Sequence, residues 1–277
     1  MKKKTSILPI VLLLTAAFLI GTYPLVSNLQ HRQMQKQMIN DYKSAVEETT
    51  KQVMEEEWIK AWEYNRHISG QKMLNDPFAD SRAQTPGSDY ENLLNLNGSG
   101  VMGYIEIPKI QVRLPIVHGT ADEDLVNAAG HLPGTSLPVG GKSSHAVISA
   151  HRGLPSAKLF TDLDRLEEED IFSLYILDKI LYYRVVQIEV VEPENTEDLR
   201  IVKGKDYVSL VTCTPYAINS HRLLVRAERT DKPENQLHFG LPNYLRIHIY
   251  EIMTAGIVLG TTAAIIIIMR KTKKSKV

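Results

Sequence analysis

Residues 206–228 have the sequence DYVSLVTCTPYAINSHRLLVRAE, and this stretch decides the expected fold. Residues typical of β-strands gather at 207–211 and again at 223–225. Between them, the segment 215–220 contains proline, asparagine and serine, which interrupt regular structure. The pattern predicts two strands joined by a polar loop.

Three chemically reactive side chains are expected at strand ends. Cys213, the only cysteine of the chain, lies where the first predicted strand ends, and Arg222 lies where the second begins. If the two strands are antiparallel neighbours, the thiol and the guanidinium lie side by side at the rim of a sheet. A further strand-like run, 146–150, ends in His151. A single cysteine cannot form an internal disulfide, and it is either a buried small hydrophobic residue or a reactive group. The strand-end position of Cys213 and the nearby Arg222 favour a reactive, nucleophilic cysteine.

The segments around these three residues resemble the signature segments of sortases, which are membrane-anchored cysteine transpeptidases of Gram-positive bacteria. They are SAHRG around His151, LVTCTP around Cys213 and HRLLVRAE around Arg222. The resemblance covers about residues 100–230. It implies a mainly β fold, the closed eight-stranded sortase barrel. It also implies that His151 is the general acid and base, that Cys213 is the nucleophile, and that Arg222 contacts the oxyanion or the substrate carbonyl.

Upstream, Asp76-Pro77-Phe78 resembles the lid motif of class C sortases, the pilus-building subgroup. By composition alone, residues 69–100 form a long loop rich in Gly, Asn, Asp, Ser and Pro, in which these three residues make a turn. The resemblance implies that Asp76 approaches the catalytic arginine or cysteine and that Phe78 covers the thiol. Asp76, Pro77 and Phe78 are therefore predicted to form a lid.

The charge of the chain is balanced in total but uneven along its length. Lys and Arg together number 32, as do Asp and Glu, yet eight of the basic residues lie within the first four and the last eight positions. Without those eight, 24 basic residues face 32 acidic ones, which leaves a net charge of −8. An acidic middle argues against nucleic acid as a partner.

Two apolar runs predict membrane-spanning helices. Residues 7–26 follow three lysines, residues 252–269 precede a basic cluster, and each run is about as long as a span requires. A cleaved signal peptide is the alternative for the first run, and a buried core helix is the weaker alternative for the second. The basic ends favour cytoplasmic termini, with residues 28–251 outside the cell membrane.

The remaining segments are expected to be helical before residue 68 and mainly β after residue 100. Residues 30–67 lack Gly and Pro and carry an approximate apolar stripe, which predicts one or two amphipathic helices. Short helices are expected at 122–130 and 158–166. Short strands, seven or eight in number, predict a closed barrel. The expected order is an N-terminal transmembrane anchor (1–27), an amphipathic helical segment (28–68), a loop with the lid (69–100), the barrel (101–230), a connector (231–251), a C-terminal transmembrane helix (252–269) and a basic cytoplasmic tail (270–277).

The residue types at the predicted site suit acyl transfer. The thiolate is the nucleophile, and a free cysteine has a pKa of about 8.5, so His151 is needed to accept the proton and later to protonate the leaving amine. A thioester on Cys213 divides the reaction into acylation and deacylation. Arg222 keeps its charge and donates in a fixed fork, which suits a developing oxyanion. Thr212 and Thr214 flank the nucleophile, and either hydroxyl is a candidate substrate contact.

The resemblance therefore implies a class C sortase, which would cleave an LPXTG-like sorting signal between Thr and Gly and join it to a lysine of a pilin subunit. The alternative within the family is a housekeeping sortase, which attaches proteins to a cell-wall precursor. A papain-like hydrolase would place its cysteine before its histidine. A two-anchor surface scaffold or a pilus-assembly chaperone is the alternative that is not an enzyme. No cofactor is expected, and zinc at His145 and His151 would lack thiolate partners and metalloprotease spacing.

Overall fold

The strand pair predicted at 206–228 is present in the computed structural model, which describes residues 8–68, 76–78 and 89–233. Strand β7 (Asp206–Thr214) runs antiparallel to β8 (His221–Thr230). Cys213 lies opposite Arg222 in their register. The thiol and the guanidinium therefore occupy neighbouring positions, as the spacing predicts.

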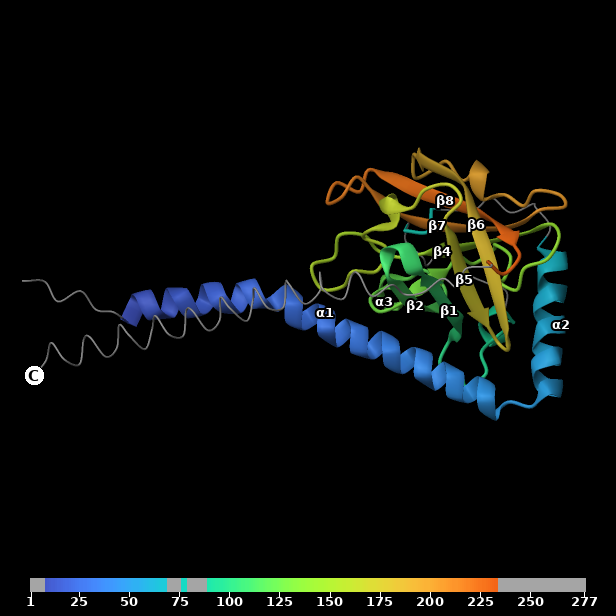
Figure 1. Cartoon of the computed structure of the whole chain (residues 1–277), viewed down its shortest axis with the longest axis horizontal. Coiled ribbons are helices and arrows are strands. Elements are labelled where there is room, and N and C mark those ends of the chain that lie inside the picture. The colour runs from blue at the N-terminus through green and yellow to red at the C-terminus, as the bar shows by residue number, and fades with distance from the viewer. Residues whose placement is uncertain (1–7, 69–75, 79–88, 234–277) are drawn as a thin grey trace, which may run out of the picture. The chain divides into compact units, whose positions relative to one another are not determined.

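Eight strands close into a barrel in the order β1-β2-β3-β4-β7-β8-β6-β5 (Figure 1). The other six strands are β1 (Val101–Ile107), β2 (Val112–His118), β3 (Ala129–His131), β4 (Ser144–Ser149), β5 (Ile171–Ile176) and β6 (Lys179–Val191). Apolar side chains such as Ile105, Ile148, Phe172 and Val225 are fully buried in the core. The predicted mainly β fold with a closed eight-stranded barrel is confirmed.

The pairing of β4 with β7 decides where the site lies. The two strands are parallel neighbours, with Ser149 opposite Val211. Parallel neighbours end at the same edge of a sheet, so the residues that follow β4 lie beside the end of β7. His151, two residues beyond β4, therefore reaches the edge that carries Cys213. Strand β8 brings Arg222 to this edge because it begins where β7 ends.

Two helices precede the barrel. Two residues separate helix α1 (Leu8–Glu48) from helix α2 (Lys51–His67). The side chain of Thr50 accepts a hydrogen bond from the backbone N–H of Val53 and so caps α2. The amphipathic helical segment predicted from the sequence is therefore two helices, the first of which continues from the preceding apolar run.

Helix α2 packs against the barrel (Figure 1). The side chain of Trp58 is buried, and its indole N–H donates to Asp178 at 2.9 Å, in the turn between β5 and β6. Asn65 forms two bonds with the backbone of Leu137, donating at 3.0 Å and accepting at 2.7 Å. Apolar burial and polar pairing thus fix this helix on the barrel surface.

The prediction of a helix at 158–166 is wrong. Only a short 3₁₀ turn, η4 (Leu163–Arg165), is present there. Leu159 has a φ of 38°, in the left-handed region, which an α-helix cannot contain. Phe160 instead donates its backbone N–H to the carbonyl of His151 at 3.1 Å, so this loop folds against the site.

The helix expected at 122–130 is shorter than predicted. Helix α3 (Asp122–Leu125) forms one turn, and the chain then enters β3. Strand β3 pairs with β2 on one side and β4 on the other, so these residues are needed to close the barrel. Tertiary pairing here overrides the local helical pattern.

Membrane spans were predicted at both ends of the chain. No helix among the residues that the structure describes is both long enough and apolar enough to cross a membrane. The C-terminal run, 252–269, and most of the predicted connector lie outside the described residues, as do the segments on either side of residues 76–78.

The packing of α2 generates a stability test with a matched control. Trp58 is 3% exposed, whereas Trp62, one turn later on the same helix, is 42% exposed. We expect Trp58→Ala to reduce the free energy of unfolding by about 3–5 kcal/mol, the usual range for a buried tryptophan. Trp62→Ala should reduce it by less, about 1 kcal/mol, because this partly exposed ring still packs on Trp58 with a centroid distance of 5.7 Å. Thermal unfolding followed by circular dichroism measures both, and equal effects would contradict the packing described here.

Candidate active site

Three strand ends bring the predicted catalytic residues to one edge of the barrel. Cys213 is the penultimate residue of β7 and is 8% exposed. Arg222, the second residue of β8, is its cross-strand partner. His151 follows β4, which is the parallel neighbour of β7. Residues more than 60 positions apart in the sequence thus meet because of sheet pairing.

Backbone and hydroxyl bonds fix the two strand ends that carry His151 and Cys213. The backbone N–H of Ala150 donates to the carbonyl of Val211 at 3.2 Å. The hydroxyl of Thr212 returns a bond to the carbonyl of Ala150 at 2.7 Å. The residues immediately before His151 and Cys213 are therefore joined, which limits the relative movement of the two catalytic side chains.

Asp76 forms an ion pair with the predicted catalytic arginine. The Nε of Arg222 donates to one carboxylate oxygen of Asp76 at 2.7 Å, and Nη2 donates to the other at 2.5 Å. Both side chains are only 11% exposed. Bidentate pairs of this kind are among the stronger polar contacts in proteins. Two donor nitrogen atoms of Arg222 are therefore already paired with a protein carboxylate.

Phe78 lies over the same edge. Its ring centroid is 5.8 Å from that of His151, with an angle of 41° between the rings. The Cζ atom of Arg222 lies 5.3 Å from the Phe78 ring. The side chain also packs on a buried apolar cluster that contains Val211 and Leu224. Its backbone N–H donates to Asp76 at 3.3 Å, so the two lid residues support each other.

Burial shifts both reactive groups toward their neutral forms. It raises the pKa of the Cys213 thiol, an effect that Arg222 opposes and that the carboxylate of Asp76 reinforces. Burial lowers the pKa of His151, which Asp122 partly opposes. The charged form of each group is disfavoured because the protein interior solvates charge poorly. In this structure, both shifts therefore favour the neutral thiol and the neutral imidazole at neutral pH.

The hydroxyls of Thr212 and Thr214 both have protein partners. Thr212 donates to the carbonyl of Ala150, as described above, and Thr214 accepts a bond from Arg152 at 3.0 Å. Their predicted contacts with substrate stay a prediction. Two further residues near His151 were not singled out by the sequence pattern: Asp122, the exposed first residue of α3, and Arg152, which follows His151. Asp122 Oδ1 lies 3.9 Å from Nε2 of His151, and Arg152 is buried immediately after it.

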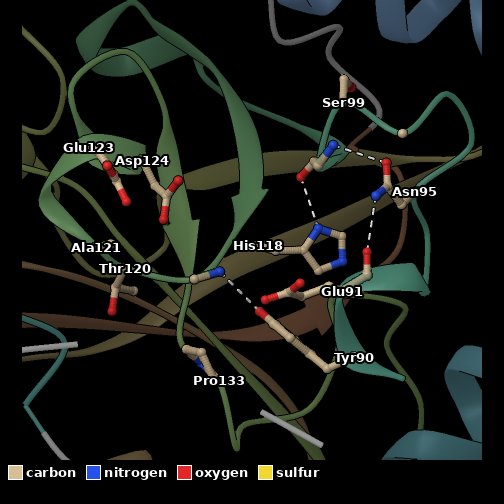
Figure 2. Close-up of a pocket in the computed structure, with 13 residues that line it drawn as sticks. Tyr90, Glu91, Asn95, Ser99, His118, Thr120, Ala121, Glu123, Asp124 and Pro133 are labelled. Carbon is tan, nitrogen blue, oxygen red and sulfur yellow. Dashed lines mark hydrogen bonds between the residues drawn. The ribbon is translucent and has the colours of Figure 1, made fainter. Parts of the chain in front are cut away.

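A separate pocket of about 510 Å³ lies between the loop before β1 and the loop after β2. Figure 2 shows His118 and Tyr90 at this pocket, with the carboxylates of Glu91, Glu123 and Asp124 around it. None of the predicted catalytic residues lines it. Across the described part of the chain, no group of three or more His, Cys, Asp or Glu side chains is arranged to hold a metal ion.

Comparison with known proteins identifies the family. A model of the sortase domain matches residues 105–230. The crystal structure of sortase C from Streptococcus pneumoniae is 43% identical in sequence, covers 71% of this chain and 97% of its own, and gives a TM-score of 0.65. The chain belongs to the sortase family. Sortase C-1 from Actinomyces oris is 42% identical, covers 65% of this sortase and 99% of its own chain, and gives a TM-score of 0.62.

A third relative is a sortase of another class. Sortase A of Streptococcus agalactiae is 34% identical over 134 residues, which make up 46% of this sortase and 52% of that relative. The matched stretch therefore spans about half of the relative's length. The solved neighbours named above are class C sortases, so the class C resemblance found in the sequence is confirmed.

The Asp76–Arg222 pair generates a prediction about the thiol of this sortase. The negative charge of Asp76 raises the pKa of Cys213, so its removal should lower that pKa. We expect Asp76→Ala to shift the pH profile of Cys213 alkylation to lower pH and to increase the rate at neutral pH. Glu197→Gln, which removes an exposed carboxylate elsewhere, is the control. An unchanged profile in Asp76→Ala would contradict the assigned electrostatics.

Proposed function

We propose that this sortase is a class C transpeptidase that joins pilin subunits through a thioester on Cys213. The observation that carries the proposal is the cross-strand pair of Cys213 and Arg222, with His151 at the same barrel edge. Acyl transfer through a thioester needs a nucleophile, a proton acceptor and a hydrogen-bond donor for the oxyanion, and a guanidinium can serve as that donor.

Acylation follows from these positions. The sulfur of Cys213 attacks the threonine carbonyl of an LPXTG-like sorting signal while its proton passes to His151. The carbonyl oxygen becomes an oxyanion, and the Arg222 guanidinium donates hydrogen bonds to it. Collapse of this intermediate breaks the Thr–Gly amide bond, and His151 returns the proton to the glycine amine as it leaves. The products of this step are a thioester on Cys213 and a free glycyl peptide.

Deacylation repeats the chemistry with a different nucleophile. A neutral lysine amine of the next pilin attacks the thioester carbonyl, and Arg222 again stabilises the oxyanion. The amine proton passes through His151 to the departing sulfur of Cys213, which restores the thiol. The result is an amide bond between the sorting-signal threonine and the lysine side chain, with no net change in the enzyme.

Arg222 can perform this role only after the lid opens. Asp76 occupies two of its donor nitrogen atoms, and Phe78 lies beside His151. We infer that the free enzyme is closed and that a sorting signal or a pilin surface displaces the lid. The Arg222 guanidinium then donates its hydrogen bonds to the developing oxyanion of the substrate in place of the Asp76 carboxylate.

The class C assignment favours pilin over cell-wall precursor as the acceptor. The Streptococcus pneumoniae sortase C, whose structure is described as giving insight into pilin substrate specificity, is 43% identical to this chain over 97% of its own length. The housekeeping alternative has its support in the shorter match to sortase A. A surface scaffold or assembly chaperone would have no need for a cysteine, a histidine and an arginine at three paired strand ends.

We further propose that the enzyme is held in the cell membrane with its barrel outside and both termini in the cytoplasm. The support lies in the sequence, where apolar runs at 7–26 and 252–269 adjoin basic residues. In the first run, Leu13 and Ile20 are 71% and 75% exposed. A membrane-impermeant maleimide should label Cys213 of Asp76→Ala on intact cells. Labelling that requires cell lysis would contradict this orientation.

The transpeptidase activity is tested with the full chain in detergent, a quenched LPXTG-type peptide and a candidate pilin. Mass spectrometry should detect a thioester adduct on Cys213, and gel electrophoresis should show covalent pilin ladders. Both products should disappear in Cys213→Ala. In Arg222→Gln the acylation rate should fall on the order of 10²-fold to 10³-fold, as expected for the loss of an oxyanion donor.

The outcomes separate the alternatives. Adducts with ladders support pilin polymerisation. Adducts without ladders, in both the wild type and Asp76→Ala, with transfer to a cell-wall precursor amine, would favour the housekeeping role. The absence of any adduct even in Asp76→Ala would favour the scaffold.

A further inference from the structure

Arg152 is a buried charge at the active site for which the proposed reaction has no use. It follows His151 directly in the sequence, and its side chain is 8% exposed. Arg165, in the same connection between β4 and β5, is 60% exposed and lies 3.6 Å from Asp162. Surface pairs of that kind contribute little to stability, whereas a guanidinium is rarely buried without specific partners.

The guanidinium of Arg152 joins two separate segments. Its Nη1 donates to the hydroxyl of Thr214 at 3.0 Å. Its Nη2 donates to the carboxylate of Asp164, in the 3₁₀ turn η4, at 2.5 Å. The third donor, Nε, is buried and has no partner among the described residues. Two of the three guanidinium nitrogen atoms thus hold the end of β7 and the η4 turn together.

The two ends of this link are the residues next to the catalytic pair. Arg152 follows His151, and Thr214 follows Cys213. On the other side, the residues that precede the pair, Ala150 and Thr212, are already joined by a hydrogen bond of 2.7 Å. His151 and Cys213 are therefore bracketed by cross-links before and after them. The backbone bonds from Ala150 to Val211 and from Phe160 to His151 also hold this edge, and the Arg152 link adds a side-chain connection between the residue after His151 and the residue after Cys213.

We propose that Arg152 is a positioning residue that fixes His151 against Cys213 by clamping the end of β7 to the loop after β4. Its role in turnover rests on the proposed function, because it acts through the two residues that exchange the proton. The rigid fork of arginine suits this role, since one planar group reaches Thr214 and Asp164 at once. A lysine could bond either partner but not hold both in a fixed geometry.

The clamp acts through geometry and not through charge. The charged groups that shift the pKa of Cys213 are Arg222 and Asp76, and the one that shifts the pKa of His151 is Asp122. The charge of Arg152 is instead paired with Asp164. Loss of Arg152 should therefore affect the reaction only as far as it displaces the histidine from the thiol.

The test compares five single changes, and the Arg152→Met/His151→Ala double variant, in the full chain in detergent, all carried in an Asp76→Ala background so that lid opening does not limit the rate. The five single changes are Arg152→Met, Arg152→Lys, Thr214→Val, His151→Ala and, as the matched control, Arg165→Met. Three quantities are measured for each: the pH profile of Cys213 alkylation by iodoacetamide, kcat and KM for acylation by a sorting-signal peptide, and the temperature of unfolding. Alkylation needs no peptide, so it tests the clamp even if the proposed substrate is wrong.

We expect Arg152→Met to lower kcat on the order of 10²-fold with little change in KM, because small displacements of reacting groups have effects of this size. Its alkylation profile should move toward that of His151→Ala, and the double variant should react no more slowly than His151→Ala alone. Arg152→Lys should recover part of kcat. Thr214→Val, which leaves the Arg152–Asp164 pair intact, should show a smaller loss in the same direction, and Arg165→Met should match the background.

A purely structural role would give a different pattern. Arg152→Met would then unfold at a lower temperature but keep the alkylation profile and the kcat of the background. Effects of Arg152→Met and His151→Ala that multiply would also overturn the proposal. If Arg152→Met does not fold, Thr214→Val and Arg152→Lys decide the question, and background values in both would contradict the clamp. Peptide turnover absent from every variant would count against the proposed function, while the alkylation profiles still test the clamp.

Discussion

The ion pair between Asp76 and Arg222 joins the predicted lid to the side chain that is proposed to stabilise the oxyanion. It joins residues 146 positions apart and uses two nitrogen atoms of the guanidinium that would stabilise the oxyanion. Because both side chains are largely buried, neither would tolerate the loss of its partner without a replacement. A substrate oxygen is such a replacement. In the proposed function, pairing with Asp76 and pairing with substrate are therefore alternative states of the Arg222 guanidinium.

Burial shifts both groups of the proposed catalytic pair toward their neutral forms. The thiol of Cys213 has a raised pKa and the imidazole of His151 a lowered one, both chiefly because of desolvation. A neutral pair is protected from unwanted reaction while the lid residues lie over it. Asp76 is the charged group that raises the thiol pKa, so under the proposed function its departure with the lid would make Cys213 easier to ionise.

The parts of the fold that the sequence predicted are those with strong local signals. Strand-forming residues at 207–211 and 223–225, with a polar loop between them, are sufficient to predict β7 and β8. The prediction of a helix at 158–166 was wrong because Leu159 adopts a left-handed conformation. The next residue, Phe160, then donates its backbone N–H to the carbonyl of His151. The contacts of Arg152 with Thr214 and of Asp122 with His151 could not be predicted from the sequence. They arise from barrel closure and have no sequence periodicity.

The most direct test asks whether Asp76 and the sorting signal compete for Arg222. Binding of an LPXTG-type peptide is measured by calorimetry in Cys213→Ala, where no thioester can form, with and without Asp76→Ala. We predict that Asp76→Ala tightens binding by about tenfold or more, a change of about 1.4 kcal/mol, because the closed state no longer withholds the guanidinium. Glu197→Gln in the same background should leave the affinity unchanged. Equal affinity with and without the Asp76 carboxylate would contradict competition for Arg222.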